Sequence, residues 1–192
     1  VREICNEKGI LLVFDEIQTG FGRTGSLFFL EQCGVTPDVL CLAKALGGGM
    51  PLGAFIADQS VMRSLTFDPV LGHITTFGGH PVSCAAANAA LNILTRERIY
   101  AQVEDKAKHF YDNLITHPLV KEIRYAGLLM AVDMPDSEIL DKVFISLIEH
   151  KILTDRFLFK PEAFRIAPPL TISFEEIDYA IRTIRKVLDS FL

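Results

Sequence analysis

Three short runs of apolar residues stand out along the first third of the chain. They cover residues 10–14, 39–43 and 53–57, and each is continuous rather than alternating with polar positions. Continuous runs of this length are typical of strands that are buried on both faces of a parallel sheet. Longer segments separate them, so the pattern predicts an α/β fold with a mostly parallel sheet and helices.

Helical periodicity dominates the rest of the chain, with two further apolar stretches that resemble strands. Pro81 occupies a favoured first-turn position, and Ser173 with Glu176 has the spacing of a capping box at the start of a last helix. The other predicted elements are helices over 82–94, 97–117 and 137–150 and strands over 123–134 and 164–172.

The change in pattern near residue 97 predicts two domains. Residues 1–96 form part of a large α/β domain, and residues 97–192 form a smaller α+β domain. Two of the first three strands end in Asp15 and Lys44. Functional sites of α/β sheets gather at the carboxyl ends of strands, so these two residues are the first candidates for a site.

Composition narrows the range of functions. The chain has 192 residues, 49% of them hydrophobic and 22% charged, which is enough apolar material to form a core. Its net charge of −5 gives no basic footprint for a nucleic acid. No apolar run approaches the roughly 18 residues of a membrane span. The four cysteines form no CxxC pair or zinc-type cluster, which predicts reduced, mostly buried thiols in a cytoplasmic protein without a metal site.

Residues 11–16, LLVFDE, resemble the Walker B strand of a nucleotide hydrolase, in which the aspartate holds Mg²⁺. That interpretation also requires a GxxxxGK[ST] loop, and the chain has none.

Gly20, Gly22 and Gly25 spell GxGxxG, the fingerprint of dinucleotide-binding proteins. The fingerprint must follow its strand directly, because the pyrophosphate lies on the helix that begins there. Here five residues intervene and the following segment, SLFFLEQCG, is short, which argues against a dinucleotide site and favours a loop that merely turns the chain.

A third interpretation takes several motifs together. They are FDEIQTGFGRTG (14–25), CLAKALGGGMPLGA (41–54), TTFGGHPVSCAAANAAL (75–91) and FRIAPPLTIS (164–173). In this order they resemble the class III aminotransferases, fold type I enzymes that use pyridoxal 5'-phosphate (PLP). The resemblance spans nearly the whole chain but lacks the longer N-terminal half of the family pattern. We therefore expect a C-terminal fragment that is inactive alone.

The resemblance implies a role for each of three residues in the first domain. Asp15 would pair with the pyridine nitrogen of PLP, and Gln18 would hydrogen-bond the phenolic oxygen of the ring. Lys44 would form the Schiff base with the cofactor and then shuttle a proton, because a desolvated amine serves both as nucleophile and as acid or base. Glu16, between the first two, has no catalytic role in this interpretation.

The resemblance also implies roles for Thr76 and Arg165. Thr76 would bind the PLP phosphate of the neighbouring subunit, so the protein would be a homodimer. Arg165 would bind the carboxylate of the substrate through its planar guanidinium group. Arg23 and His80 match family residues without an assigned role, and the remaining histidines are expected to be structural or exposed.

The implied activity is transfer of an amino group between an amine or amino acid and a 2-oxo acid. An aminomutase, racemase or decarboxylase of the same family would share these motifs, so another PLP reaction is an alternative. A non-catalytic fragment that retains the fold is a further alternative.

Overall fold

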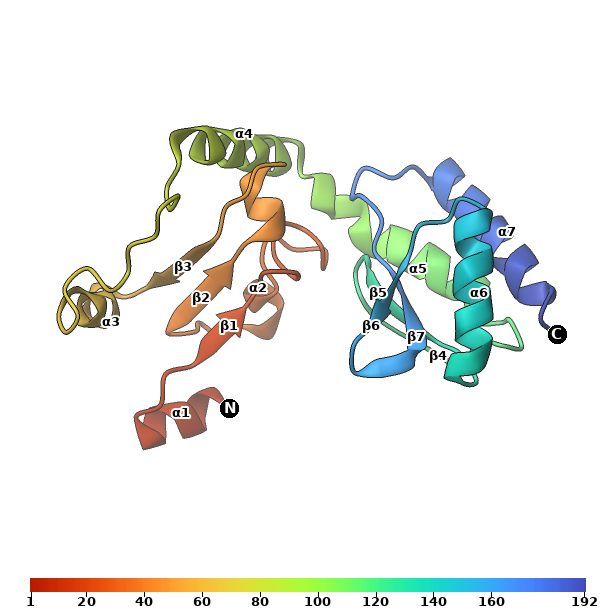
Figure 1. The fold of residues 1–192 in the computed structure, drawn as a ribbon, viewed down its shortest axis with the longest axis horizontal. Coiled ribbons are helices and arrows are strands. Elements are labelled where there is room, and N and C mark those ends of the chain that lie inside the picture. Colours follow the sequence, from red (N-terminus) through yellow and green to blue (C-terminus); the bar gives the residue numbers. More distant parts are fainter. The chain divides into compact units, whose positions relative to one another are not determined.

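The computed structural model describes all residues from 1 to 192, and they fall into two units (Figure 1). The first unit comprises Val1–Gly22 and Ser26–Arg98, and the second comprises Arg23–Gly25 and Ile99–Leu192. The chain thus enters the second unit for three residues of the glycine-rich loop before it returns to the first. No helix in either unit is both long enough and apolar enough to cross a membrane.

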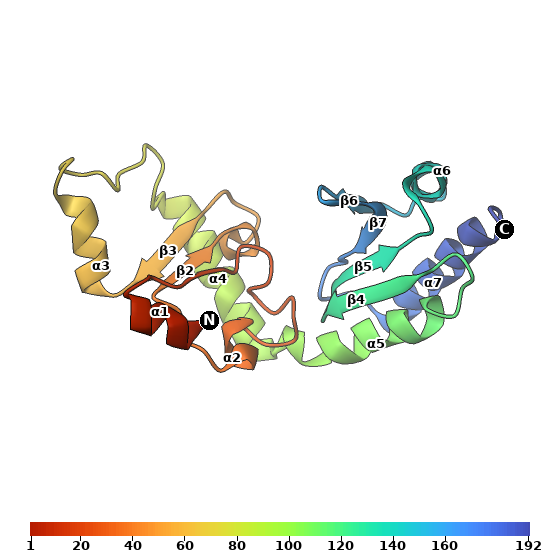
Figure 2. The same cartoon turned by 90° about the horizontal axis from the view of Figure 1, so that it is seen from below.

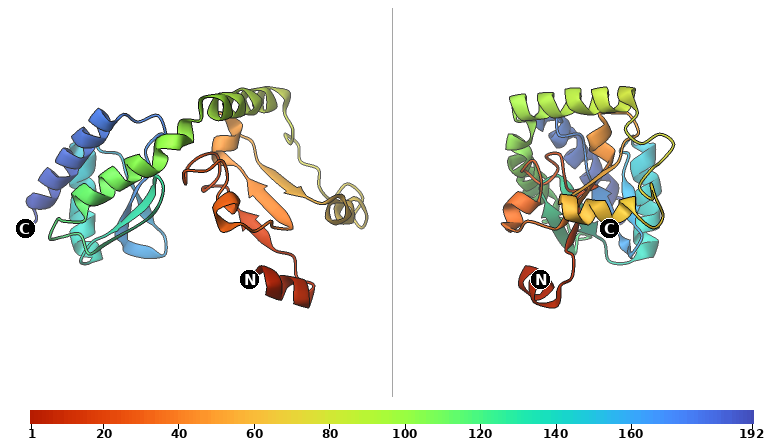
Figure 3. Two further views of the ribbon diagram at one scale, coloured as in Figure 1. Left: turned by 180° about the vertical axis from the view of Figure 1, so that it is seen from behind. Right: turned by 90° about the vertical axis from the view of Figure 1, so that its left-hand side faces the viewer.

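The first unit is built on a three-stranded sheet with the order β1-β2-β3. Strand β1 (Val13–Asp15) is parallel to β2 (Val39–Leu42), and β2 is antiparallel to β3 (Ala54–Ala57). Figure 3 shows this sheet from behind, with α4 over the short 3-10 helix that follows β2. The helices are α1 (Arg2–Lys8), α2 (Leu30–Cys33), α3 (Gln59–Arg63) and α4 (Pro81–Glu97), with 3-10 turns η1 (Lys44–Gly47) and η2 (Ser64–Thr66).

The expectation that these strands are buried on both faces is wrong for this chain. Val13 on β1 and Ile56 on β3 are 52% and 56% exposed. Three strands and their helices leave apolar faces of the sheet uncovered. The prediction of mostly buried cysteines is also wrong, because only Cys5 of the four is buried; Cys33 and Cys84 are exposed.

The second unit contains a four-stranded antiparallel sheet with the order β4-β5-β7-β6. Figure 2 shows helices α5 and α7, which pack against each other, beside this sheet. Phe110, Met130, Phe164 and Ile177 belong to its buried core. The elements are η3 (Ile99–Gln102), α5 (Val103–Leu114), β4 (Glu122–Ala126), β5 (Leu129–Asp133), α6 (Ser137–Glu149), β6 (Asp155–Phe157), β7 (Lys160–Ile166) and α7 (Phe174–Asp189).

The single strand predicted over 123–134 is instead a hairpin formed by β4 and β5. The chain reverses at Gly127, whose φ of +54° is rare for residues other than glycine. The strand predicted over 164–172 begins and ends earlier, at Lys160 and Ile166. The predicted capping box is present, with both hydrogen bonds between Ser173 and Glu176.

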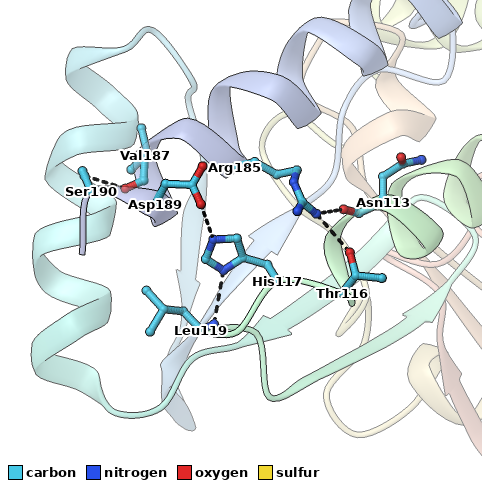
Figure 4. Close-up of polar contacts among 8 residues, drawn as sticks. All are labelled: Asn113, Thr116, His117, Leu119, Arg185, Val187, Asp189 and Ser190. Carbon is cyan, nitrogen blue, oxygen red and sulfur yellow. Dashed lines mark hydrogen bonds and ion pairs between the residues drawn. The ribbon is translucent and has the colours of Figure 1, made fainter. Parts of the chain in front are cut away.

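A buried histidine joins the end of α7 to the turn after α5 (Figure 4). His117 is 2% exposed, and its Nε2 lies 3.1 Å from Asp189 Oδ1. Its Nδ1 accepts the backbone N–H of Leu119 at 3.2 Å. Arg185 donates to Thr116 Oγ1 at 3.0 Å. His117 is therefore structural.

Candidate functional site

The two predicted strand ends meet at one edge of the first sheet. Strands β1 and β2 are parallel, and Asp15 is the register partner of Cys41. Asp15 is the last residue of β1, and Lys44 follows the end of β2 by two residues. Because both strands run in the same direction, an acid and an amine lie at neighbouring carboxyl ends.

The turn after β1 brings Gln18 to Lys44. Asp15 Oδ1 accepts the backbone N–H of Ile17 at 3.0 Å, which bends the chain directly after the strand. The backbone N–H of Glu16 still donates to Cys41 O at 3.0 Å. After this turn, Lys44 Nζ donates to Gln18 Oε1 at 3.5 Å, the long limit of a hydrogen bond. The structure therefore brings together the amine and the amide.

Lys44 has an uncommon backbone conformation. Its φ is +49°, in the left-handed region that few residues other than glycine adopt. It begins η1, and Gly48, which caps the end of η1, has a φ of +59°. A Cβ on Gly48 would lie 2.6 Å from Ala86 O on α4, so the backbone after Lys44 fits closely against this helix. Strained positions of this kind cluster at functional sites.

Glu16 is a residue of this region whose importance the sequence did not reveal. Its residue exposure is 2%, and its carboxylate accepts the backbone N–H groups of Phe29 and Leu30, each at 2.7 Å. The Thr19 hydroxyl donates to it at 3.1 Å. Glu16 thus closes the glycine-rich loop onto the strand end that carries Asp15. The only signal in the sequence for this role was the position of Glu16 between Asp15 and a glycine-rich loop. Many exposed glutamates occupy similar positions, so the signal is weak.

Thr76 is not brought to these residues. It lies in an exposed segment between η2 and α4, and no hydrogen bond links its side chain to Asp15, Gln18 or Lys44. His80 immediately precedes α4, and its side chain does not cap the helix.

Arg165 belongs to the second unit, on β7, where its register partners are Ala131 on β5 and Asp155 on β6. Its guanidinium group forms an ion pair with the Asp155 carboxylate, and its Cζ lies 5.8 Å from the centre of the Phe157 ring. Arg165 is therefore a cation held by an acid across the strands. Another carboxylate, such as that of a substrate, could bind the guanidinium group of Arg165 only alongside Asp155 or in its place.

The glycine-rich loop does not have the geometry of a dinucleotide site. The helix that follows, α2, begins at Leu30 and has four residues. A pyrophosphate would need a helix that begins at the glycines themselves, whereas Gly20 and Gly22 lie in turns and Gly25 lies in a bend.

Residues 1–188 match the model of the family described as aminotransferase class-III. The chain belongs to the class III aminotransferases. This membership confirms the resemblance of the motifs and explains why the Walker B and dinucleotide patterns lack their partner elements.

Solved structures of other class III aminotransferases and transaminases resemble the chain. The ornithine aminotransferase of Toxoplasma gondii is 37% identical with a TM-score of 0.88, and the match covers 98% of this chain and 45% of that one. A Bacillus anthracis aminotransferase is 28% identical with a TM-score of 0.89, over 99% of this chain and 47% of that one. A transaminase from the marine bacterium Virgibacillus is 30% identical with a TM-score of 0.89, over 98% and 47%.

The chain spans about half the length of these relatives. The mixed α/β architecture predicted from the sequence is that of part of a class III aminotransferase. The Toxoplasma ornithine aminotransferase has PLP at partial occupancy in its active site, and PLP is the cofactor of the family.

The residues at the sheet edge fit this cofactor chemically. PLP carries an aldehyde, a phenolic oxygen and a basic ring nitrogen. An amine can bind the aldehyde, an amide the phenolic oxygen, and a carboxylate the ring nitrogen. Lys44, Gln18 and Asp15 are such a set, at the ends of two adjacent strands.

Proposed function

We propose that this chain is the C-terminal half of a PLP-dependent transaminase. The enzyme would transfer an amino group between an amine or amino acid and a 2-oxo acid. The observation that supports this most directly is the 3.5 Å approach of Lys44 Nζ to Gln18 Oε1 at the strand end that carries Asp15. The family match over residues 1–188 supports the same reaction class.

Three residues of the first unit would hold the cofactor, which when bound serves as an electron sink for the bonds of the substrate amine. Lys44 would hold the aldehyde carbon and, once free, would move a proton as general acid and base. Gln18 would hydrogen-bond the phenolic oxygen. Asp15 would keep the ring nitrogen protonated, because a carboxylate close to a basic nitrogen stabilises its charged form.

Arg165 would bind the substrate carboxylate. Its planar guanidinium group can donate two parallel hydrogen bonds to a carboxylate, a geometry that lysine cannot offer. The ion pair with Asp155 orients the group when no substrate is present.

Thr76 would bind the phosphate of the cofactor in a neighbouring subunit, so that the functional protein is a homodimer. The exposure of the Thr76 segment leaves its hydroxyl accessible to another chain. A reducing compartment such as the cytoplasm would suit the four free cysteines.

Activity would require the half of the protein that precedes these residues in its relatives. The exposed apolar positions of the first unit, Ile10, Val13 and Ile56 among them, would then be covered. We expect the 192 residues alone to show little or no turnover.

The substitution Asp15→Asn in the full-length protein tests the proposed reaction. It should leave PLP bound but slow amino-group transfer by about 10²–10³-fold, the usual cost of removing one electrostatic stabiliser. Product analysis in the same assay separates transfer of the amino group from racemisation, migration or decarboxylation. A rate near that of the unchanged enzyme would show that Asp15 does not govern the ring nitrogen.

A further inference from the structure

Arg23 stands in the GFGRTG motif, yet the proposed function gives it no task. With Thr24 and Gly25 it belongs to the second unit, whereas the residues on either side of this segment belong to the first. Its surroundings in the second unit therefore indicate its role.

The side chain of Arg23 joins the ends of two strands. Its Nη1 donates to Leu128 O at 3.0 Å and to Pro168 O at 2.6 Å. Leu128 directly precedes β5, and Pro168 follows the last residue of β7 by two positions. Strands β5 and β7 are antiparallel neighbours with Met130 opposite Ile166, so both carbonyls lie at the same end of the sheet.

The backbone of the same segment is held equally closely. Arg23 O accepts the N–H of Leu128 at 3.0 Å. A Cβ on Gly127 would lie 2.6 Å from Arg23 O and 2.8 Å from Thr24 C, so only glycine fits there. The hairpin turn between β4 and β5 is thus shaped to receive this segment.

The guanidinium group is partly buried and forms no ion pair with a carboxylate in the chain; its partners are the two carbonyl oxygens. Burial without an acid lowers the pKa of Arg23. Burying a cation costs free energy, so the contact would be a poor way of merely adding stability. The arrangement is better explained if the function of Arg23 is to fix the adjacent ends of β5 and β7.

The strand end that Arg23 holds also carries Arg165. Arg165 is the penultimate residue of β7 and lies three positions before Pro168. Its register partner on β5, Ala131, is three positions after Leu128. A shift of either strand end would therefore turn the guanidinium group of Arg165.

We propose that Arg23 is a positioning residue for Arg165, so that the affinity for the substrate carboxylate depends on a side chain that does not touch the substrate. This inference rests on the proposed function, in which Arg165 binds that carboxylate. Misplacement by about 1 Å is enough to weaken such bidentate contacts strongly.

The test uses the full-length protein loaded with PLP and glutarate, an unreactive dicarboxylate, as the probe. Isothermal titration calorimetry gives the dissociation constant of glutarate, and visible absorption gives the PLP content. Arg23→Met keeps the apolar stem but leaves Leu128 O and Pro168 O without their donor. It should raise the dissociation constant about tenfold, or ~1.4 kcal/mol, without changing the PLP content. Arg23→Lys, which retains the charge and one donor group, should recover part of the affinity.

Arg165→Met is the reference variant, and the double variant shows whether the two residues act through each other. If Arg23 positions Arg165, then Arg23→Met should weaken glutarate binding no further once Arg165 is gone. Independent, additive losses would contradict the inference.

Three other results would overturn it, in distinguishable ways. Unchanged affinity in Arg23→Met, with affinity lost in Arg165→Met, would refute the role of Arg23 alone. Unchanged affinity in Arg165→Met would instead refute the proposed carboxylate site. Failure of both Arg23→Met and Arg23→Lys to fold or retain PLP would also overturn the inference, because Arg23 would then be required by the whole protein.

Discussion

Lys44 Nζ and Gln18 Oε1 lie 3.5 Å apart, although the two residues are 26 positions apart in the chain. The parallel pairing of β1 with β2 places the two strand ends side by side, and the turn after Asp15 directs Gln18 toward the amine. We expect this relationship to depend on two local features, the burial of Glu16 and the close fit of Gly48 on α4. Both can be tested separately from catalysis.

Replacing Glu16 with glutamine should open the glycine-rich loop. The Phe29 and Leu30 N–H groups donate to separate oxygens of the carboxylate, whereas an amide offers one oxygen and a competing donor. Hydrogen bonds to a charged group are strong, so we expect a loss of about 2–3 kcal/mol in the free energy of unfolding. Denaturant unfolding of the full-length protein measures this.

Glu7→Gln provides the control, because Glu7 is exposed on α1. Surface changes of this kind usually stay within about 0.5 kcal/mol. Equal effects of Glu16→Gln and Glu7→Gln would contradict the proposed closure of the loop.

Gly48→Ala should disturb the packing of η1 on α4. Gly48 and Gly9 have nearly the same φ, +59° and +63°, but only a Cβ on Gly48 would collide with another residue, 2.6 Å from Ala86 O. Gly9→Ala therefore measures the left-handed strain alone, about 1–2 kcal/mol. Gly48→Ala should cost about 1–3 kcal/mol more, because it adds overpacking. Equal melting temperatures for the two variants would show that the collision is relieved at no cost.

Asp38 should make part of the stability of the first unit depend on pH. The backbone N–H of Leu12, at 2.7 Å, and then the Arg2 guanidinium group, at 2.8 Å, hold the pKa of Asp38 below its ordinary value of 3.8. A lowered pKa in the folded state means that the stabilisation is present above 3.8 and is lost as the pH falls through the lowered value.

Asp38→Asn should therefore reduce stability at pH 7 and flatten its decline below pH 4. Unfolding curves at a series of pH values, with Asp105→Asn as the exposed control, measure the difference. A variant that declines as steeply as the unchanged protein in acid would contradict this role.

The sequence predicted the carboxyl ends of β1 and β2 and the helices α4, α5, α6 and α7, because apolar periodicity and capping patterns are local signals. The apolar runs that precede Asp15 and Lys44 therefore indicated that these residues lie at strand ends, and the two strands are neighbours in the sheet. The β4–β5 hairpin was missed because Gly127 is the only turn residue in a long apolar stretch. The burial of Glu16 and the role of Arg23 depend on residues distant in the chain, such as Leu30, which no local pattern reveals.

Trapping of the cofactor on a lysine tests the central claim most directly. The full-length protein is incubated with PLP, reduced with borohydride and digested, and the labelled peptide is identified by mass spectrometry. We predict that the label is on Lys44 and that Lys44→Ala, with Lys8→Ala as the control, loses it. Label on any other lysine, or undiminished labelling of Lys44→Ala, would contradict the assignment of Lys44 and with it the proposed site.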